Sequence, residues 1–280
     1  MKVVTRLADL RGIIGEYRRE SRTIGFVPTM GALHEGHLSL VRIAREQAQR
    51  CVVSLFVNPT QFGPEEDYRL YPRAAQRDAE LLTAEGVDVI FMPDIAEVYP
   101  EGWAIQVDPG PVGNVFEGAV RPGHFAGVLT VVAKLFHMVE PDVAVFGQKD
   151  AQQIFLIRRM MADLNFPVQI VEGETVRETD GLACSSRNAY LSPAQRAKAT
   201  VLFRALCAGK KTAESTGRSL RRVQEAMAKV AAAEPDFSPD YATAVSDATF
   251  SEEDPLPPQA RLIIAGRLGP VRLIDNVRMD

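Results

Sequence analysis

Cysteine is scarce in this chain, and its distribution argues against two classes of protein. Only three of the 280 residues are cysteines, Cys51, Cys184 and Cys207, and they are widely separated. An odd number without Cys-x-x-Cys spacing is not the pattern of a disulfide-stabilised secreted domain or of a zinc site. The cysteine content therefore predicts a protein of the reducing cytoplasm.

Long apolar runs and blocks of one charge are also missing. No run reaches the roughly 18 apolar residues of a membrane-spanning helix, and the stretch from Met1 to Glu16 lacks the apolar core of a secretory signal. The 32 basic and 36 acidic residues leave a net charge of −4 without a long basic block. Binding to a nucleic-acid backbone depends on clustered positive charge. These absences predict a cytoplasmic protein with no membrane and no nucleic-acid partner.

The first two-thirds of the chain alternates short apolar segments with amphipathic ones. Apolar runs of strand length, separated by stretches with helical spacing, predict an α/β fold with a parallel sheet and helices on both faces. The strands are expected at Ile24–Pro28, Cys51–Val57, Val87–Phe91, Val143–Phe146 and Val168–Val171. The helices are expected near Leu38–Arg50, Arg73–Glu85, Gly127–Val139 and Ala151–Leu164.

The pattern changes after about Ala189 and predicts a second, smaller α+β domain. Ser192-Pro193 is a helix-start signal, with proline in the first turn. Two helices are then expected, followed by three strands: Ala194–Lys211, Arg218–Ala233, Tyr241–Val245, Arg261–Ala265 and Val271–Ile274. We therefore predict two domains, residues 1–175 and 176–280.

Two of the four histidines lie three residues apart at the start of a predicted helix. His34 and His37 follow the strand Ile24–Pro28 and are accompanied by Gly31 and Gly36. Backbone N–H groups at a helix start attract anions, and imidazole N–H groups stabilise charge that develops on phosphates. A surface histidine beside a capping histidine is the alternative. The strand–turn–helix context favours a nucleotide phosphate site.

Polar residues also follow the second predicted strand. The carboxamide of Gln61 suits a small substrate that bears hydroxyl and carboxylate groups, and the polar loop Gly63–Tyr71 behind it is a candidate lid. A later glycine-rich segment, Gly118–Gly127, has two interpretations. It is either a loop ordered by Arg121 and His124, or a direct contact to the substrate.

A second junction between a strand and a helix, Phe146–Gln153, carries Lys149. A lysine ammonium at a helix start binds a phosphate as a point charge, and Gln153 lies four residues on, on the same helical face. The alternative is a solvated lysine beside a capping Asp150. Further along, Ser185–Arg187 offers two hydroxyls and a guanidinium to a polyphosphate, with a polar linker as the alternative.

Taken together, these motifs resemble the pantothenate synthetase family, whose members are also called pantoate–β-alanine ligases. The similarity covers essentially the whole chain, and five motifs follow one another in the family's order. They are Pro28–His37, Phe56–Phe62, Arg121–Val128, Phe146–Asp150 and Ser185–Asn188. The resemblance implies a Rossmann-like fold for residues 1–175 and a lid role for residues 176–280.

The resemblance also implies a two-step ligase reaction that uses Mg²⁺. The carboxylate of pantoate attacks the α-phosphorus of ATP, which gives pantoyl adenylate and pyrophosphate. The amine of β-alanine then attacks the acyl carbon and releases pantothenate and AMP. A homodimer is implied as well. The metal ligands stay unassigned, because Asp78 matches an acidic position of some members whereas Arg77 departs from the pair of acids found there.

The same resemblance implies roles for individual residues. His37, His34 and Lys149 would be catalytic. Gln61 and Gln153 would bind pantoate, and Gln61 would also bind β-alanine. ATP would be bound by Met30, Gly31, Ala32, Leu33, His34, Glu35, Gly36, His37, Gly147, Gln148, Lys149, Asp150, Val176, Cys184, Ser185, Ser186 and Arg187.

Two other functions compete with this interpretation. A plain nucleotidyltransferase would stop at an adenylylated product, and Gln61 and Gln153 argue against it because they suit a second substrate. An RNA-binding module derived from a synthetase fold would need a basic stripe, which a net charge of −4 disfavours. Amide formation that depends on an amine distinguishes the ligase from both.

Overall fold

A computed structural model describes residues 1–64 and 66–279 of the chain. The chain forms two compact units, each with its own hydrophobic core. The N-terminal unit contains residues 1–114, 121–148 and 156–174, and the C-terminal unit contains residues 115–120, 149–155 and 175–280. Two short segments that precede residue 175 therefore belong to the C-terminal unit.

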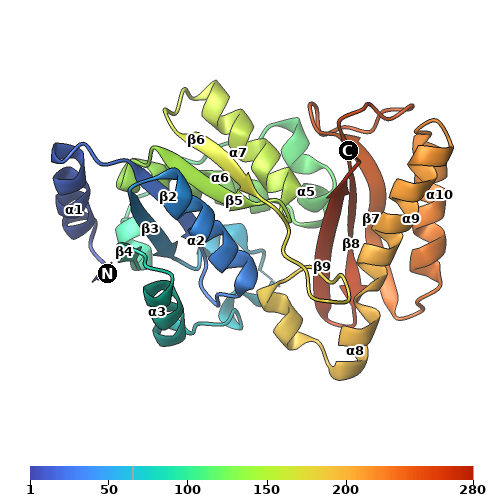
Figure 1. The fold of residues 1–280 in the computed structure, drawn as a ribbon, viewed down its shortest axis with the longest axis horizontal. Coiled ribbons are helices and arrows are strands. Elements are labelled where there is room, and N and C mark those ends of the chain that lie inside the picture. Colours follow the sequence, from blue (N-terminus) through green and yellow to red (C-terminus); the bar gives the residue numbers. More distant parts are fainter. Residues whose placement is uncertain (65, 280) are drawn as a thin grey trace. The chain divides into compact units, whose positions relative to one another are not determined.

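A six-stranded parallel sheet forms the centre of the N-terminal unit (Figure 1). The strands are β1 (Lys2–Val4), β2 (Ile24–Thr29), β3 (Arg50–Leu55), β4 (Val89–Phe91), β5 (Val143–Gly147) and β6 (Gln169–Gly173). They pair in the order β1-β4-β3-β2-β5-β6, and every pair is parallel. The sequence predicts five of these strands. It misses β1, because three residues with little burial carry no readable periodicity.

Helices cover both faces of this sheet, as predicted. The elements around it are α1 (Leu7–Arg19), α2 (Glu35–Gln47), α3 (Ala75–Ala84), α4 (Ile95–Val98), α6 (His124–Val139) and the 3₁₀ helices η1 (Pro59–Gln61), η2 (Asp67–Arg69) and η3 (Pro111–Asn114). On β2, Phe26 packs edge-on against Phe136 of α6, whereas Val27 joins the core formed with α2 and α3. Neighbouring side chains of a strand point to opposite faces, so α2 and α6 lie on opposite sides of the sheet.

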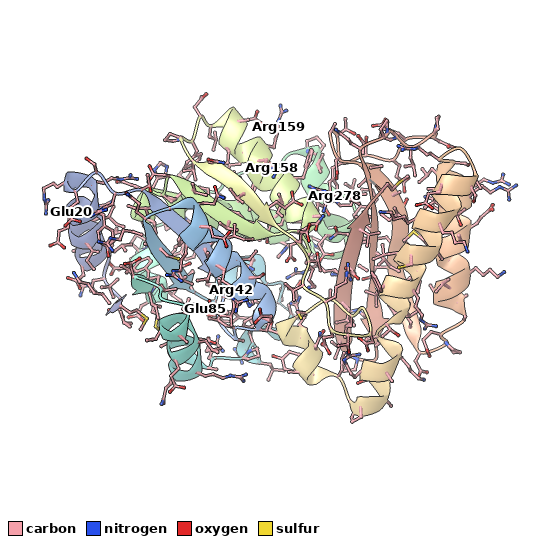
Figure 2. The ribbon with its side chains drawn as sticks, viewed as in Figure 1. Glu20, Arg42, Glu85, Arg158, Arg159 and Arg278 are labelled. Carbon is pink, nitrogen blue, oxygen red and sulfur yellow. The ribbon has the colours of Figure 1, made fainter. Side chains whose placement is uncertain are left out.

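The helices α2 and α3 are joined by both apolar and polar contacts. Val41 of α2 and Leu82 of α3 lie in one buried core. Figure 2 shows Arg42 beside Glu85, to which it donates hydrogen bonds of 2.5 and 3.1 Å. Solvent screens an exposed ion pair, whereas burying one such apolar side chain contributes about 1.5–3 kcal/mol. The apolar contacts therefore dominate the packing of α2 on α3.

The C-terminal unit is built on an antiparallel sheet in the order β7-β8-β9 (Figure 1). Its elements are α5 (Glu117–Val120), the first turn of α7 (Ala151–Asp163), the 3₁₀ helix η4 (Ser186–Tyr190), α8 (Pro193–Lys198), α9 (Val201–Ser215), α10 (Leu220–Ala232), β7 (Phe237–Ser246), β8 (Ala260–Leu268) and β9 (Val271–Arg278). Leu206 of α9, Met227 of α10 and Leu262 of β8 are fully buried in its core. The predicted α+β class of this part of the chain is confirmed.

The prediction of one continuous helix over Ala194–Lys211 is wrong. The helix α8 ends at Lys198, and α9 begins at Val201 after a short break. Ala199, Val201 and Leu202 are all fully buried or nearly so. Neither residue of the break, Ala199 or Thr200, is a glycine or a proline, so no helix-stop signal marks it in the sequence.

Candidate active site

The strand order of the N-terminal unit brings two predicted site segments together. β2 pairs with β3 on one side and with β5 on the other, so the growth of the sheet changes direction between β2 and β5. Ligands of open parallel sheets bind at such a switch point, outside the carboxyl ends of the strands. Met30–His37 follows β2, Gly147 ends β5, and Gln148 comes directly after it. Both segments therefore lie at this edge of the sheet.

His34 and His37 together form the start of α2. His34 is the N-cap residue, and its Nδ1 accepts a hydrogen bond of 3.2 Å from the N–H of Gly36. The Nδ1 of His37 accepts one of 3.4 Å from the N–H of His34, and the two ring centroids are 4.1 Å apart. A ring nitrogen that accepts a hydrogen bond carries no proton, so each neutral ring has its N–H at Nε2. The two rings form a pair of Nε2–H donors.

This capping arrangement changes the expected mode of anion binding at α2. The N–H of Gly36 donates to the His34 ring, and the N–H of His37 donates to the carbonyl of His34 at 2.8 Å. These backbone groups already have partners within the chain. A phosphate at this helix start would therefore meet imidazole N–H groups, while the helix dipole still favours its negative charge.

The turn before α2 is held by a buried carboxylate from α3. Asp78 is 2% exposed and accepts hydrogen bonds from the N–H groups of Ala32 and Leu33 at 2.8 and 2.9 Å. Gly31 and Ala32 have φ of +81° and +51°, a conformation that costs a non-glycine residue roughly 1–2 kcal/mol. Hydrogen bonds to a charged group contribute about 1.5–3 kcal/mol each and offset that strain. No local pattern indicated this bracing role, because Asp78 lies 45 residues or more from its partners.

Gln61 lies at the end of η1 and is 9% exposed. Its Nε2 donates to the Sδ of Met30 at 3.2 Å, and its Oε1 accepts from the Nδ2 of Asn58 at 3.0 Å. The structure thus brings Gln61 against the first residue of the predicted ATP segment. Thioether sulfur is a weak acceptor, so a substrate hydroxyl or carboxylate could replace it as the stronger partner of this amide.

Asn58, at the start of η1, is held by contacts from distant parts of the chain. It is 1% exposed, its Nδ2 also donates to the carbonyl of Gly127 at 3.1 Å, and its Oδ1 accepts from the hydroxyl of Tyr99 at 2.8 Å. Both ends of this buried amide therefore have partners, as stability requires. These contacts hold the η1 turn, and Gln61 with it, against α6. The sequence could not reveal them, because Tyr99 and Gly127 lie 41 and 69 residues away.

Replacing Gly127 by alanine is expected to displace Gln61. A Cβ at Gly127 would lie 2.3 Å from the carbonyl oxygen of Thr60 and 2.7 Å from the N–H nitrogen of Gln61. Both atoms belong to the backbone, so the whole turn must shift, and such overpacking costs about 1–3 kcal/mol. We expect a lower free energy of unfolding in urea and a higher KM for the substrate that Gln61 is predicted to contact.

The matched control for this substitution is Gly12→Ala in α1. A Cβ at Gly12 meets nothing within 4 Å, and alanine is favoured over glycine within a helix by about 1 kcal/mol. Gly12→Ala is therefore expected to leave kinetics unchanged and to stabilise the fold slightly. Wild-type stability and KM in Gly127→Ala would show that the close approach of α6 and η1 does not position Gln61.

Arg121 and His124 act on the residues that follow η1. The Nδ1 of His124 lies 2.8 Å from the carbonyl oxygen of Gln61, and Arg121 donates to Glu66 at 2.6 and 2.9 Å. Arg121 Nη1 also lies 3.1 Å from His124 Nε2, so the guanidinium donates to Nε2 and the ring carries its proton at Nδ1. The two side chains thus order the residues after η1, and the direct substrate contact offered as the alternative for Gly118–Gly127 stays a prediction. Within the candidate lid 63–71, Glu65 lies outside the described residues.

In the C-terminal unit, Lys149, Gln152 and Gln153 lie in different surroundings at the start of α7. The helix begins at Ala151, so Lys149 lies in the preceding turn, and the prediction that it shares a helical face with Gln153 is wrong. Gln152 is 6% exposed, accepts from the N–H of Glu117 at 3.1 Å and donates to the carbonyl of Val115 at 2.9 Å. Gln152 is therefore structural, whereas the neighbouring Gln153 is only half-buried.

A short hairpin in the C-terminal unit brings the remaining predicted residues together. Arg177 pairs with Ala183, and the N–H of Cys184 donates to the carbonyl of Val176 at 2.9 Å. The hydroxyl of Ser185 then caps η4 by accepting from the N–H of Arg187 at 3.3 Å. Val176 and the segment Cys184–Arg187, which are eight residues apart in sequence, thus lie side by side.

Three features of residues 1–64 and 66–279 bear on the nature of the site. No helix among them combines the length and apolar character needed to cross a membrane. Nowhere in this part of the chain do three His, Cys, Asp or Glu side chains gather as they would around a metal ion. The cysteines are free thiols, and burial raises the pKa of Cys51 to about 12.

The sequence matches a known family over almost its whole length. The profile described as Pantoate-beta-alanine ligase matches residues 2–278. The pantothenate synthetase of Acidothermus cellulolyticus is 52% identical over 274 residues, which cover 95% of this chain and 90% of the relative. The pantothenate synthetase of Thermus thermophilus is 50% identical over 283 residues, which cover 100% of this chain and 99% of the relative.

Solved structures show the same architecture. A crystal structure of the Thermus thermophilus pantothenate synthetase has a TM-score of 0.95 at 49% identity, covering 100% of this chain and 99% of its own. The pantoate-beta-alanine ligase of Francisella tularensis, solved in complex with beta-gamma ATP and beta-alanine, has a TM-score of 0.83 at 32% identity, covering 100% and 98%. The predicted fold class is therefore confirmed by proteins with known structures.

Proposed function

Because the chain belongs to the pantoate–β-alanine ligase family, we propose that it joins pantoate to β-alanine with the cleavage of ATP to AMP and pyrophosphate. Pantoyl adenylate is the intermediate, and pantothenate is the product. The reaction makes a carbon–nitrogen bond and supplies a precursor of coenzyme A. The observation that carries the proposal is the pair of Nε2–H donors formed by His34 and His37 at the switch point of the sheet.

In the first step, the carboxylate of pantoate attacks the α-phosphorus of ATP. Two anions must approach each other, so the reaction needs fixed donors where negative charge increases. His37 and His34 supply two such donors, and we assign the segment Met30–His37 and residues Gly147–Gln148 to the nucleotide. Asp78 holds the turn in place before substrate arrives, which lowers the cost of reorganisation during the step.

The residues of the C-terminal unit complete the nucleotide site in this proposal. Lys149 places an ammonium on the phosphates, Asp150 follows it, and the hairpin residues Val176 and Cys184–Arg187 bind the rest of ATP. Serine hydroxyls and a guanidinium together form directed hydrogen bonds to phosphate, whereas lysine acts as a compact charge.

Pantoate and β-alanine are assigned to glutamine side chains. Gln61 and Gln153 bind pantoate, because neutral amides recognise hydroxyl and carboxylate groups without adding charge. Gln61 also contributes to the β-alanine site. In the second step, the amine of β-alanine attacks the acyl carbon and AMP leaves. We propose that residues 176–280 and the loop 63–71 act as lids that keep water from the adenylate until the amine arrives.

We propose that Mg²⁺ enters as the cation bound to ATP. Mg²⁺ keeps several waters and binds mostly through substrate phosphates with one or two carboxylates. The described residues fit this mode, since they contain no cluster of three metal-ligating side chains and Asp78 uses both carboxylate oxygens on backbone N–H groups. When bound, Mg²⁺ neutralises part of the phosphate charge. The family resemblance also leads us to propose a homodimer in the cytoplasm.

The two-step scheme predicts a specific isotope exchange. Exchange of label between pyrophosphate and ATP is expected to require pantoate but not β-alanine, because the adenylate forms before the amine reacts. The measurement uses labelled pyrophosphate with each substrate omitted in turn. An absolute requirement for β-alanine would contradict the scheme. Pantoate-dependent exchange without formation of pantothenate from added β-alanine would identify a nucleotidyltransferase instead.

A further inference from the structure

Asn276 on β9 is a buried residue with no role in the reaction scheme above. It is 3% exposed, its Nδ2 donates to the carbonyl oxygen of Lys149 at 2.8 Å, and its Oδ1 accepts from Nη1 of Arg261 at 2.8 Å. Arg261 is itself 4% exposed and donates from Nε to Asp247 at 2.9 Å. The Lys149 carbonyl is therefore tied to the central part of the C-terminal unit through an amide that is fixed at both ends.

The neighbouring residue, Asp275, holds the second predicted nucleotide segment of this unit. Its carboxylate is 4% exposed and accepts two hydrogen bonds from Arg177, at 2.7 and 3.0 Å. Arg177 also donates to the carbonyl of Asn276 at 3.0 Å. It pairs with Ala183 in the hairpin that runs from Val176 to Cys184. Two consecutive residues of β9 thus contact the turn of Lys149 and the hairpin.

The contact with Asn276 sets the plane of the peptide between Lys149 and Asp150. In a trans peptide the C=O and N–H point in opposite directions, so the N–H of Asp150 points away from Asn276. Lys149 lies in the turn before α7, which begins at Ala151. The direction in which its side chain leaves the backbone is therefore set by the two peptide planes that flank Lys149 rather than by a helix, and Asn276 holds one of them.

We propose that Asn276 is a positioning residue for Lys149, and that the hydrogen bond from its Nδ2 to the Lys149 carbonyl orients the ammonium for adenylate formation. The inference rests on the proposed function of Lys149. The ammonium sits on a flexible four-carbon chain, so the backbone is the part of Lys149 that the fold can hold. A displacement of about 1 Å at a reacting centre lowers a rate by about 100-fold.

The substitution Asn276→Asp tests the donor alone. Aspartate keeps the shape of the side chain and the oxygen that Arg261 contacts, but it has no N–H for the Lys149 carbonyl. We expect pantoate-dependent pyrophosphate–ATP exchange to fall by about 10- to 100-fold in kcat, with the KM for pantoate unchanged. Asn276→Ala removes the same donor without adding charge and is expected to give the same kinetic pattern, so it also serves if Asn276→Asp does not fold.

The matched control is Asn114→Asp, at an exposed asparagine whose Nδ2 donates to the carbonyl of Gly110 at 3.5 Å. The same change of atoms there is expected to leave exchange at the wild-type rate. Thermal unfolding of all variants reports any general loss of stability, because a smaller amount of folded enzyme would also lower the apparent kcat at unchanged KM.

A double-mutant cycle with Lys149→Ala separates positioning from a merely structural role. If Asn276 acts through Lys149, Asn276→Asp is expected to slow the Lys149→Ala enzyme by less than about threefold, because groups that act as a unit are not additive. Equal losses in both backgrounds would overturn the inference, and so would wild-type kinetics in folded Asn276→Asp and Asn276→Ala. A wild-type enzyme without pantoate-dependent exchange would count against the proposed function instead.

Discussion

Replacing His37 by alanine is expected to slow pantoate-dependent pyrophosphate–ATP exchange by about 100- to 1,000-fold, or about 3–4 kcal/mol of barrier. The substitution removes one of the two Nε2–H donors proposed to stabilise charge on the phosphates. The fold should persist, because the lost hydrogen bond to the His34 N–H is long, 3.4 Å, and lies in a half-buried turn. The measurement is exchange at saturating substrates together with thermal unfolding.

Two isosteric variants distinguish the donor from the cap. Asparagine places its amide near the position of the ring Nδ1, so His37→Asn can still accept from the His34 N–H but lacks the distal donor. Glutamine reaches further and presents an N–H near the position of Nε2. We expect His37→Asn to be as slow as His37→Ala, and His37→Gln to recover part of the rate.

His137→Ala is the control for histidine substitution elsewhere in the fold. His137 lies exposed on α6, beside the ring of Phe166, and its replacement is expected to leave exchange unchanged. A wild-type rate in a folded His37→Ala enzyme would contradict the role proposed for the two imidazoles as donors to phosphate. The chain would still have the fold of the family, but the imidazole pair would be only a helix cap.

Replacing Lys149 by alanine is the second change with a large expected effect. We expect exchange to fall by about 100- to 1,000-fold, mainly in kcat, because a charge that acts on developing phosphate charge contributes more to the transition state than to binding. Lys149 is half-buried in a turn whose carbonyl is fixed by Asn276. The turn itself should therefore survive loss of the side chain, and the unfolding midpoint should change little.

The control for this prediction is Lys211→Ala on α9, where the side chain is exposed. Removing a surface lysine there changes the net charge of the chain by the same amount without touching the proposed site. Equal losses in both variants would point to long-range electrostatics, which salt screens over about 10 Å at 0.1 M. A rise in the KM for ATP at unchanged kcat would assign Lys149 to ground-state binding alone.

The alternation of apolar and amphipathic segments was enough to predict most of the fold. Five of the six parallel strands and the three C-terminal strands lie where short apolar runs predicted them. The helix α1 was missed, although Leu10, Ile13 and Ile14 form its buried stripe at helical spacing. The stripe is narrow, and the many charged residues around it left few apolar positions from which to predict a helix. The break between α8 and α9 was missed because no glycine or proline marks it in the sequence.

The predicted functional segments could be named because each is contiguous in sequence, whereas the residues that hold them could not. Asp78 bridges to the turn before α2 from α3, Asn58 ties η1 to α6, and Asn276 ties β9 to the turn of Lys149. These three contacts join residues that are 46, 69 and 127 positions apart. One sequence without aligned relatives carries no trace of such pairs, since any of these residue types is ordinary at a turn or on a surface.

The sequence by itself determined the class of fold and the family and predicted the segments proposed to carry the chemistry, because burial periodicity and contiguous motifs are local properties of a chain. Only the tertiary structure decided how those segments are held. It showed that the N–H groups of Gly36 and His37 donate to His34, so that Nε2–H groups are the donors proposed for a phosphate. It also showed that Asp78 holds the turn before α2 and that Gln152 binds the backbone of Glu117. A hydrogen bond has a direction and a partner, and both are fixed only when distant parts of the chain meet.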